Sequence, residues 1–243
     1  MHHSTSSPDS SQSGIPQGKH LHQISRTFAG TSRSRRRNGM SPLPRLYAIA
    51  DASFGDPVQL AEALFDGGAR LVQVRNKFAS SLELLDQVER ILKRAPSDAR
   101  VIVNDRADVA RIAGAAGVHL GQDDLNPADA RRVLGAGRIL GYSTHNLDQA
   151  EAADGLPADY IAAGPVFPTS TKLNADPVLG LEKLAAICRI VHKPVVAVGG
   201  IKLENVRDVL QAGAHSVAVI RDLLDSSDVA ARAREWVKHV NAE

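Results

Sequence analysis

The sequence contains a single cysteine, Cys188, among its 243 residues. One cysteine excludes an internal disulfide and any metal site that needs several thiolates. Cys188 falls within an apolar helical pattern, which favours a buried side chain over a nucleophile. A chain with so little cysteine fits a reducing compartment, so a cytoplasmic location is expected.

Long hydrophobic runs are also missing. No uninterrupted apolar stretch approaches the roughly 20 residues that a membrane-spanning helix needs, so we expect no membrane partner. With 43% hydrophobic and 23% charged residues, the composition is that of an ordinary soluble globular chain. The length permits one large domain or two small ones.

The first 44 residues lack the hydrophobic periodicity of a helix or a strand. They are rich in Ser, Gly, Pro, His and Arg, which predicts a disordered tail over residues 1–44. The tail holds six basic residues and one acidic residue, whereas the part from Arg45 onward holds 23 basic and 26 acidic residues. The formal net charge of +2 therefore combines a basic tail with a mildly acidic domain over residues 45–243.

A basic cluster at residues 33–37 raises the alternative of a nucleic-acid-binding or membrane-surface tail. The cluster has no interleaved aromatic residues on which bases could stack, so a solvated tail is the favoured interpretation. The acidic balance of residues 45–243 argues against nucleic-acid binding by the domain. We therefore expect small molecules as partners, while an assembly of identical chains stays open.

From Arg45 onward, short apolar runs alternate with amphipathic segments. Helical periodicity marks residues 58–66, 82–94, 127–134, 181–191 and 203–211. The strand-like runs are eight in number, at residues 46–49, 71–74, 101–103, 118–120, 139–142, 160–163, 195–198 and 217–220. Eight strand-helix units in about 200 residues predict a closed (β/α)8 TIM barrel with parallel strands. An open doubly wound sheet is the alternative, but no turn carries its Gly-x-Gly-x-x-Gly fingerprint.

Polar residues follow the second apolar run, where a barrel of this kind would place its active site. Gln73, Arg75 and Lys77 have a period-two spacing, which directs all three toward the barrel axis. Two inward-facing cations favour an anionic ligand, because unpaired charges are costly in a core. Pairing with neighbouring carboxylates is the alternative.

Carboxylates follow the third and fourth apolar runs. Asp105 comes shortly after residues 101–103, and Asp123 and Asp124 come shortly after residues 118–120. Two carboxylates from adjacent strands, beside arginine and lysine, suit a Mg²⁺ ion that is shared with a diphosphate. Capping of the following helix by Asp105 is an equally weighted alternative.

The later strand ends offer hydroxyls and glycines. Residues 164–172 contain two prolines, three hydroxyls and a lysine, so this loop suits either an anionic ligand or a polar surface connection. Gly199 and Gly200 follow the seventh run, and Ile220 and Arg221 end the eighth. These are the positions at which such barrels often bind phosphate.

Taken together, these motifs resemble the thiamine phosphate synthase family. The resemblance covers Arg45 to the C-terminus and rests on residues 73–77, 103–105, 119–125, 141–143 and 164–172. It implies an enzyme that condenses 4-amino-2-methyl-5-hydroxymethylpyrimidine diphosphate with 4-methyl-5-(2-phosphoethyl)thiazole. The implied reaction is dissociative: diphosphate leaves first, and the thiazole nitrogen then captures a methylene cation.

The resemblance also implies roles for individual residues. Those expected at the pyrimidine diphosphate are Gln73, Arg75, Lys77, Asn104, Ser143 and Lys172, with Arg75, Lys77, Ser143 and Lys172 as the catalytic set. Those expected at the thiazole phosphate are Thr169, Ser170, Thr171, Gly200, Ile220 and Arg221. The implied cofactor is Mg²⁺ on Asp105 and Asp124, with Asp124 preferred to Asp123 because the family motif reads Gly-Gln-x-Asp. Arg221 departs from the family pattern, which often has serine there.

Such a reaction needs no general base, because the thiazole nitrogen has no proton to lose. His119 and His145 are therefore not expected to be catalytic, and a packed or hydrogen-bonded side chain is expected for His119. The alternative function is a thiazole-phosphate-binding barrel of the same fold, a tautomerase or regulatory protein, without synthase activity.

Overall fold

The computed structural model describes residues 41–169 and 176–242. Contacts divide the chain into one unit of residues 1–41 and a compact unit from Pro42 to Glu243. The tail prediction falls almost wholly on residues 1–40, which lie outside the described residues. No helix in the described part of the chain is long and apolar enough to cross a membrane.

Residues 42–44, which precede the predicted start of the domain at Arg45, pack against the barrel. Leu43 is buried, and the carbonyl oxygens of Pro42 and Pro44 accept hydrogen bonds from Arg100 and Ser216. Two prolines fix the backbone torsions of this short segment, so little conformational entropy is lost when it packs against the barrel. The segment therefore belongs to the folded domain.

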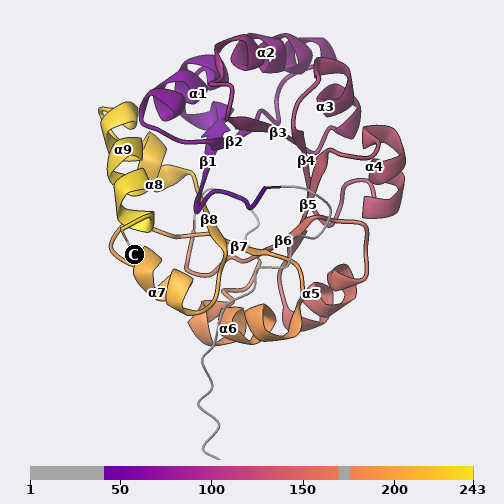
Figure 1. Ribbon diagram of the computed structural model, residues 1–243, viewed down its shortest axis with the longest axis vertical. Coiled ribbons are helices and arrows are strands. Elements are labelled where there is room, and N and C mark those ends of the chain that lie inside the picture. The colour runs from indigo at the N-terminus through magenta and orange to yellow at the C-terminus, as the bar shows by residue number, and fades with distance from the viewer. Residues whose placement is uncertain (1–40, 170–175, 243) are drawn as a thin grey trace, which may run out of the picture. The chain divides into compact units, whose positions relative to one another are not determined.

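Eight parallel strands close into a barrel in chain order, which confirms the predicted TIM barrel (Figure 1). β1 pairs with both β2 and β8, so the sheet has no free edge. The strands are β1 (Leu46–Asp51), β2 (Leu71–Arg75), β3 (Arg100–Asn104), β4 (Gly117–Leu120), β5 (Ile139–Thr144), β6 (Tyr160–Ala163), β7 (Val195–Val198) and β8 (Ser216–Val219).

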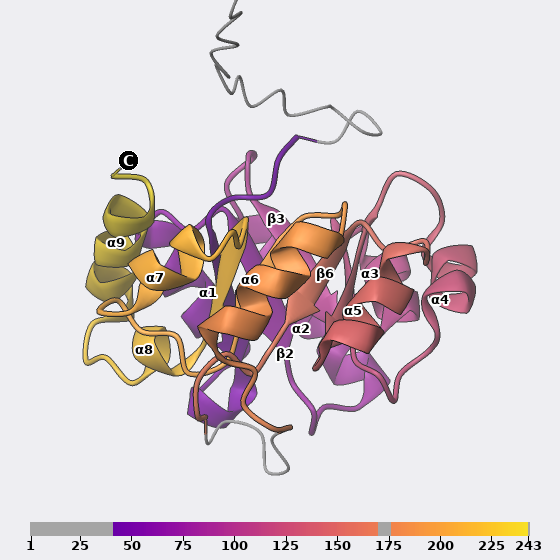
Figure 2. The same cartoon turned by 90° about the horizontal axis from the view of Figure 1, so that it is seen from below.

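Helices surround the barrel as an outer ring (Figures 1 and 2). They are η1 (Ala52–Phe54), α1 (Pro57–Asp66), α2 (Ser81–Arg94), α3 (Ala107–Ala113), α4 (Pro127–Leu134), α5 (Leu147–Asp154), α6 (Gly180–Ile190), α7 (Val206–Gln211), α8 (Arg221–Leu224) and α9 (Val229–Val240). The starts of α2 and α4 follow capping chemistry: Ser80 and Glu83 form a reciprocal capping box at α2. Pro127 stands in the first turn of α4 after the N-cap Asn126.

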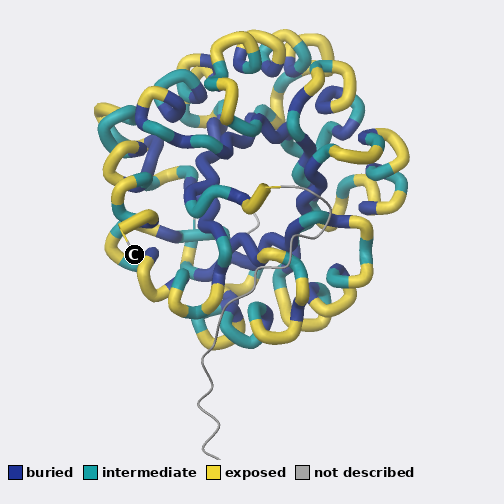
Figure 3. The backbone as a smooth tube through the Cα atoms, in the orientation of Figure 1, coloured by how far each residue is buried: buried dark blue, intermediate teal, exposed yellow. Residues whose placement is uncertain are grey.

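The core lies between the strands and the inner faces of the helices. Figure 3 shows the buried residues concentrated on the strand ring, with the exposed residues on the outer sides of the helices. Val72 and Val74 of β2 pack outward into this core, whereas Gln73 between them faces the barrel interior. This alternation follows the pleat of a strand. It leaves the barrel interior open to polar side chains.

Candidate active site

A cavity of about 1070 Å³ opens at the C-terminal ends of the strands. It is lined by residues from many of the strand ends. Every predicted site residue within the described part of the chain lines it, namely Gln73, Arg75, Lys77, Asn104, Asp105, Asp124, Ser143, Thr169, Gly200, Ile220 and Arg221. Ser170, Thr171 and Lys172 lie outside the described residues.

The Arg75 guanidinium is held from behind by a buried carboxylate. Arg75 Nη1 lies 2.5 Å from Asp51 Oδ2, and the Asp51 side chain is only 2% exposed. The other carboxylate oxygen accepts hydrogen bonds from the backbone N–H and the hydroxyl of Ser53, at 2.9 and 2.7 Å. Because Asp51 is fixed at the start of η1, it fixes one end of the guanidinium, while Arg75 still lines the cavity.

Lys77 lies two residues after Arg75, beyond the end of β2. Its ammonium is 2.6 Å from Asp105 Oδ2, and its side chain is 48% exposed. Both predicted cations therefore pair with carboxylates, as the pairing alternative expected. Both also line the cavity, so the inward direction predicted from the period-two spacing is confirmed.

Asp105 and Asp124 form a carboxyl pair beside Lys77. Burial raises the pKa of Asp124, and the hydrogen bond that its protonated form donates to the Asp105 carboxylate adds to the increase. Asp124 Oδ2 also accepts a hydrogen bond from the backbone N–H of Gly121 at 2.7 Å. Two oxygen donors held together in this way carry unfavourable like charge, which a cation would relieve.

The helix-capping alternative for Asp105 is wrong. The N-cap of α3 is Arg106, and no side chain caps this helix. Asp105 itself has a φ of +62°, in the left-handed region that few residues other than glycine adopt. Its backbone N–H donates to the carbonyl of His119 on the next strand at 2.8 Å, which holds the residue beside the end of β4.

A chain of five polar side chains crosses the barrel interior. The Gln73 amide nitrogen donates to the Tyr47 hydroxyl at 2.8 Å, and the Tyr47 and Tyr160 hydroxyls lie 3.0 Å apart. His119 continues the chain, with Nδ1 2.9 Å from the Tyr160 hydroxyl and Nε2 2.9 Å from Ser143 Oγ. The expectation of a hydrogen-bonded His119 is therefore confirmed. Burial lowers the pKa of His119 to about 4, so the ring is neutral at pH 7.

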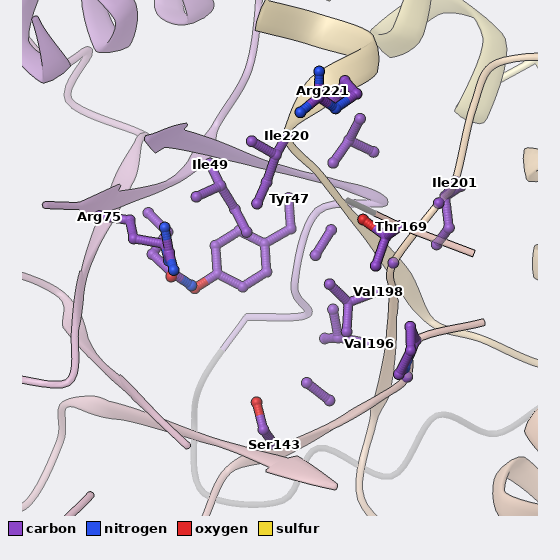
Figure 4. A pocket seen from close by; sticks show the side chains of 18 of the residues that line it. Tyr47, Ile49, Arg75, Ser143, Thr169, Val196, Val198, Ile201, Ile220 and Arg221 are labelled. Atoms are coloured by element: carbon purple, nitrogen blue, oxygen red, sulfur yellow. The ribbon is translucent and has the colours of Figure 1, made fainter. Parts of the chain in front are cut away.

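The opposite side of the cavity combines apolar and charged side chains. Figure 4 shows Tyr47 between Arg75 and a group that contains Val198, Ile201 and Thr169. Ile220 and Arg221 approach this group from β8 and α8. The cavity thus has a charged end near β2 to β4 and a second end near β6 to β8. These are the two ends at which the sequence predicts two anions.

The paired glycines after β7 bring this loop against the loop after β6. A Cβ atom on Gly200 would lie 2.5 Å from the Pro168 carbonyl oxygen, and one on Gly199 would lie 2.6 Å from Pro165. Both glycines also have positive φ, at +95° and +64° for Gly199 and Gly200. The packing of the two loops therefore requires these glycines.

The side chain of Arg221 has partners of its own. Its Nη1 atom lies 2.9 Å from Asp225 Oδ2, and its guanidinium lies 5.2 Å from the centre of the Phe54 ring. The neighbouring Asp222 accepts hydrogen bonds from Trp236 and Arg232 of α9, at 2.7 and 2.8 Å. The start of α8 is therefore anchored to α9 and to η1.

Several residues of this site were not predicted from the sequence. Tyr47 and Tyr160 lie within the predicted apolar runs at residues 46–49 and 160–163, and Asp51 follows the first of these runs. The sequence pattern gave no sign that their polar atoms belong to the site. Gln122 binds the Ser143 backbone carbonyl through its amide at 2.5 Å, and it belongs to the motif at residues 119–125. His145 Nδ1 lies 2.7 Å from the Gly164 carbonyl oxygen, which fixes the start of the loop after β6.

Comparison with known proteins gives a consistent result. A family model described as thiamine monophosphate synthase matches residues 46–223. The thiamine-phosphate synthase of Koribacter versatilis is 47% identical over 203 residues, which cover 81% of this chain and 95% of that protein. That of Anaeromyxobacter dehalogenans is 45% identical and covers 77% of this chain and 84% of that protein.

A solved structure agrees with the sequence relatives. The thiamine phosphate pyrophosphorylase from Pyrococcus furiosus superposes with a TM-score of 0.76 at 35% identity, covering 82% of this chain and 96% of that one. The matched region contains the barrel and the strand ends that line the cavity. The chain belongs to the thiamine monophosphate synthase family.

Proposed function

We propose that the chain joins the pyrimidine diphosphate to the thiazole phosphate in the cavity at the strand ends, by a dissociative substitution. The general role, a thiamine-phosphate synthase and hence a transferase, follows from family membership. The observation that supports the site assignment is the convergence of every described predicted ligand on one cavity at the strand ends.

Mg²⁺ would be held by Asp105 and Asp124. No group of three or more His, Cys, Asp or Glu side chains that could hold a metal occurs in the described part of the chain. Mg²⁺ typically takes one or two carboxylates and completes its shell with water and substrate phosphate oxygens, so two carboxylates fit. When bound, the ion supplies charge stabilisation for the departing diphosphate.

The protein's own contribution at this end is positive charge in fixed positions. Arg75 is oriented by Asp51, and Lys77 lies beside Asp105 at the edge of the same cavity. Both side chains favour the state in which negative charge has accumulated on the diphosphate. Neither residue has to accept a proton, which suits a reaction without a general base.

The thiazole phosphate would occupy the other end, where Thr169, Gly200, Ile220 and Arg221 line the cavity. The apolar side chains between the two ends, among them Ile49, would keep water away from the cation. Lys172, Ser170 and Thr171 stay predicted ligands.

The decisive experiment measures diphosphate release when both substrates and Mg²⁺ are mixed with the protein, compared with each substrate alone. Release that needs both substrates is expected. If no diphosphate is released even when both substrates and Mg²⁺ are present, the alternative, a thiazole-phosphate-binding barrel without synthase activity, is the better description. That alternative does not require the charged set around Asp105 and Asp124.

The metal assignment has its own test. Asp124→Ala should lower turnover by about 100-fold or more, because it removes one of two carboxylate ligands at the leaving group. Asp123→Ala, a matched control at the adjacent cavity position, should change turnover less than about threefold. Steady-state kinetics over a range of Mg²⁺ concentrations would detect the difference. A larger loss from Asp123→Ala would show that the assignment is wrong.

A further inference from the structure

Tyr47 of β1 lines the cavity, although only 1% of the residue is exposed. Figure 4 shows its ring extending toward the side on which Arg75 lies. The hydroxyl contacts the side chains of Gln73 on β2 and Tyr160 on β6, at 2.8 and 3.0 Å. It therefore lies deep in the barrel, where a polar group needs a partner in the protein or in a bound molecule.

Both neighbours donate to the Tyr47 oxygen. The Gln73 amide nitrogen has only protons to offer, and the Tyr160 hydroxyl donates to Tyr47 as well. A hydroxyl has two lone pairs and one proton, so both lone pairs of Tyr47 are used. Its own proton then has no acceptor among the residues that the structure describes. A molecule that offers an acceptor at this point of the cavity would satisfy it.

The surroundings of Tyr47 keep this donor protonated and in place. Burial raises the pKa of Tyr47 above its ordinary value, so the phenol stays neutral at physiological pH. The Tyr160 ring meets the Tyr47 ring edge-on, at 84° and 6.0 Å between the ring centres. A Cβ atom on Gly141 would overlap the Tyr160 ring, so the absence of a side chain on β5 makes the space for this contact.

We propose that the Tyr47 hydroxyl binds the ligand directly, by donating its proton to a neutral acceptor atom at the floor of the cavity. Its partner Gln73 precedes Arg75 by two residues, or about 7 Å of strand, so the hydroxyl lies deeper than the cations that suit an anion. A ring nitrogen of a heteroaromatic molecule is an acceptor of this kind, because it is uncharged and has a lone pair in the ring plane. Naming a ring nitrogen of the aminopyrimidine as that atom rests on the proposed function.

The tautomer of His119 tests the proposal without any ligand. Tyr160 gives its proton to Tyr47, so it must accept from His119 Nδ1, and the neutral ring then carries its proton on that nitrogen. In ¹⁵N-labelled histidine at pH 7.5, the Nδ1–H tautomer should exceed the Nε2–H tautomer by about tenfold or more, because the minor form breaks a buried hydrogen bond. An equal mixture, or an excess of the Nε2–H tautomer, would mean that Tyr160 donates to His119 and takes up the Tyr47 proton. Either result would overturn the proposal.

Calorimetry with two ligands tests the contact itself. One is the aminopyrimidine diphosphate, and the other is an aminobenzene analogue in which C–H groups replace both ring nitrogens. Both carry a C–P bond in place of the reactive C–O bond, so neither loses diphosphate during the measurement. Tyr47→Phe should weaken binding of the pyrimidine by about 3- to 10-fold, since one neutral hydrogen bond is lost. Binding of the analogue should not weaken, because it has no ring acceptor to lose.

Tyr142→Phe is the matched control. Tyr142 of β5 does not line the cavity, so this variant should leave the ratio of the two affinities unchanged. Inorganic diphosphate should bind Tyr47→Phe within about twofold of wild type, because the change lies away from the cations. An equal loss of affinity for both ring compounds would show that Tyr47 has only a structural role, and it would overturn the proposal.

Two further outcomes keep the test decisive. If Tyr47→Phe does not fold, the two ligands are compared in wild type, which should favour the pyrimidine by about fivefold or more, because the analogue leaves a buried donor unpaired. Equal affinities there would overturn the proposal. If the pyrimidine does not bind wild type at all, the proposed function fails, whereas the His119 tautomer still decides whether Tyr47 has a proton to donate.

Discussion

Asp51→Asn tests whether the position of Arg75 depends on the carboxylate behind it. Asp51 is 2% exposed at its side chain and binds Arg75 Nη1 at 2.5 Å through one oxygen. Through the other oxygen it accepts two hydrogen bonds from Ser53. The substitution keeps the shape and an oxygen for Ser53 while it removes the negative charge. It therefore isolates the ion pair from the cap of η1.

The expected size follows from these contacts. With the amide oxygen kept for Ser53, the amide NH2 group faces Arg75 Nη1, and two donors cannot form a hydrogen bond. The charge-assisted hydrogen bond is therefore lost, and the free energy of unfolding should fall by about 1.5–3 kcal/mol. Arg75 is 23% exposed, so water partly solvates the guanidinium, and the larger loss of a fully buried pair does not apply. For a domain of about 200 residues this corresponds to a Tm lower by roughly 3–12 °C.

Activity should respond through orientation. A guanidinium that is no longer held from behind should lower kcat/KM by about tenfold, since small misplacements of catalytic groups are costly. The affinity for inorganic diphosphate should change less than about threefold, because removal of a nearby negative charge offsets the lost orientation. Steady-state kinetics, calorimetry and thermal unfolding measure the three quantities.

Asp98→Asn is the matched control. Asp98 pairs with Arg70 at 3.0 Å, but the side chains are 69% and 37% exposed and lie away from the cavity. An exposed pair contributes about 0–1 kcal/mol, so little change in Tm and none in kcat/KM is expected. If Asp51→Asn lowered Tm as calculated and left kcat/KM unchanged, the orienting role of Asp51 would be refuted.

Two further predictions concern pH and loop packing. The pKa of His119 is lowered from 6.5 to about 4 on folding, so the unfolded chain binds more protons between these values and stability falls as pH falls through them. Urea unfolding at pH 7.5 and 4.5 should show that the free energy of unfolding falls by at most about 3 kcal/mol in wild type and that this fall is absent in His119→Gln. An equal pH dependence of the free energy of unfolding in both proteins would contradict an origin in His119. Gly200→Ala should destabilise by about 2–4 kcal/mol, because its Cβ would lie 2.5 Å from the Pro168 carbonyl oxygen. Gly114 has a similar φ of +76°, and a Cβ atom there would have no atom within 4 Å, so Gly114→Ala should lower the free energy of unfolding by only about 1 kcal/mol. Equal losses in the two variants would exclude crowding as the cause.

The barrel could be predicted because its signal is local and repeated. Each strand is a short β-rich apolar run such as Val195–Val198, and each predicted helix carries its own periodicity. The helices α3, α5, α8 and α9 were not marked from the sequence. Length alone does not explain this, because α9 has twelve residues whereas the predicted α4 has eight. Packing against the sheet, rather than intrinsic propensity, holds such helices.

The charged end of the site could be predicted for a related reason. A charged side chain on the inward-facing side of a strand, such as Arg75, is costly in a core without a partner. The sequence alone therefore predicts a ligand or an ion-pair partner at such a position. What the sequence did not supply is which carboxylate pairs with which cation. Asp51 is separated from Arg75 by 24 residues, and only the pairing of β1 with β2 brings them opposite one another.

The polar chain from Gln73 to Ser143 shows most clearly where inference from sequence ends. Tyr47 and Tyr160 count as apolar in a strand pattern, and they do fill the core with their rings. Their hydroxyls come into contact only because the closed barrel brings β1 and β6 to one interior. The two residues are 113 positions apart in the sequence. A buried tyrosine must satisfy its hydroxyl, so two of them in one interior force a shared solution. In this protein that solution ends at Gln73 and Ser143, two residues that line the cavity.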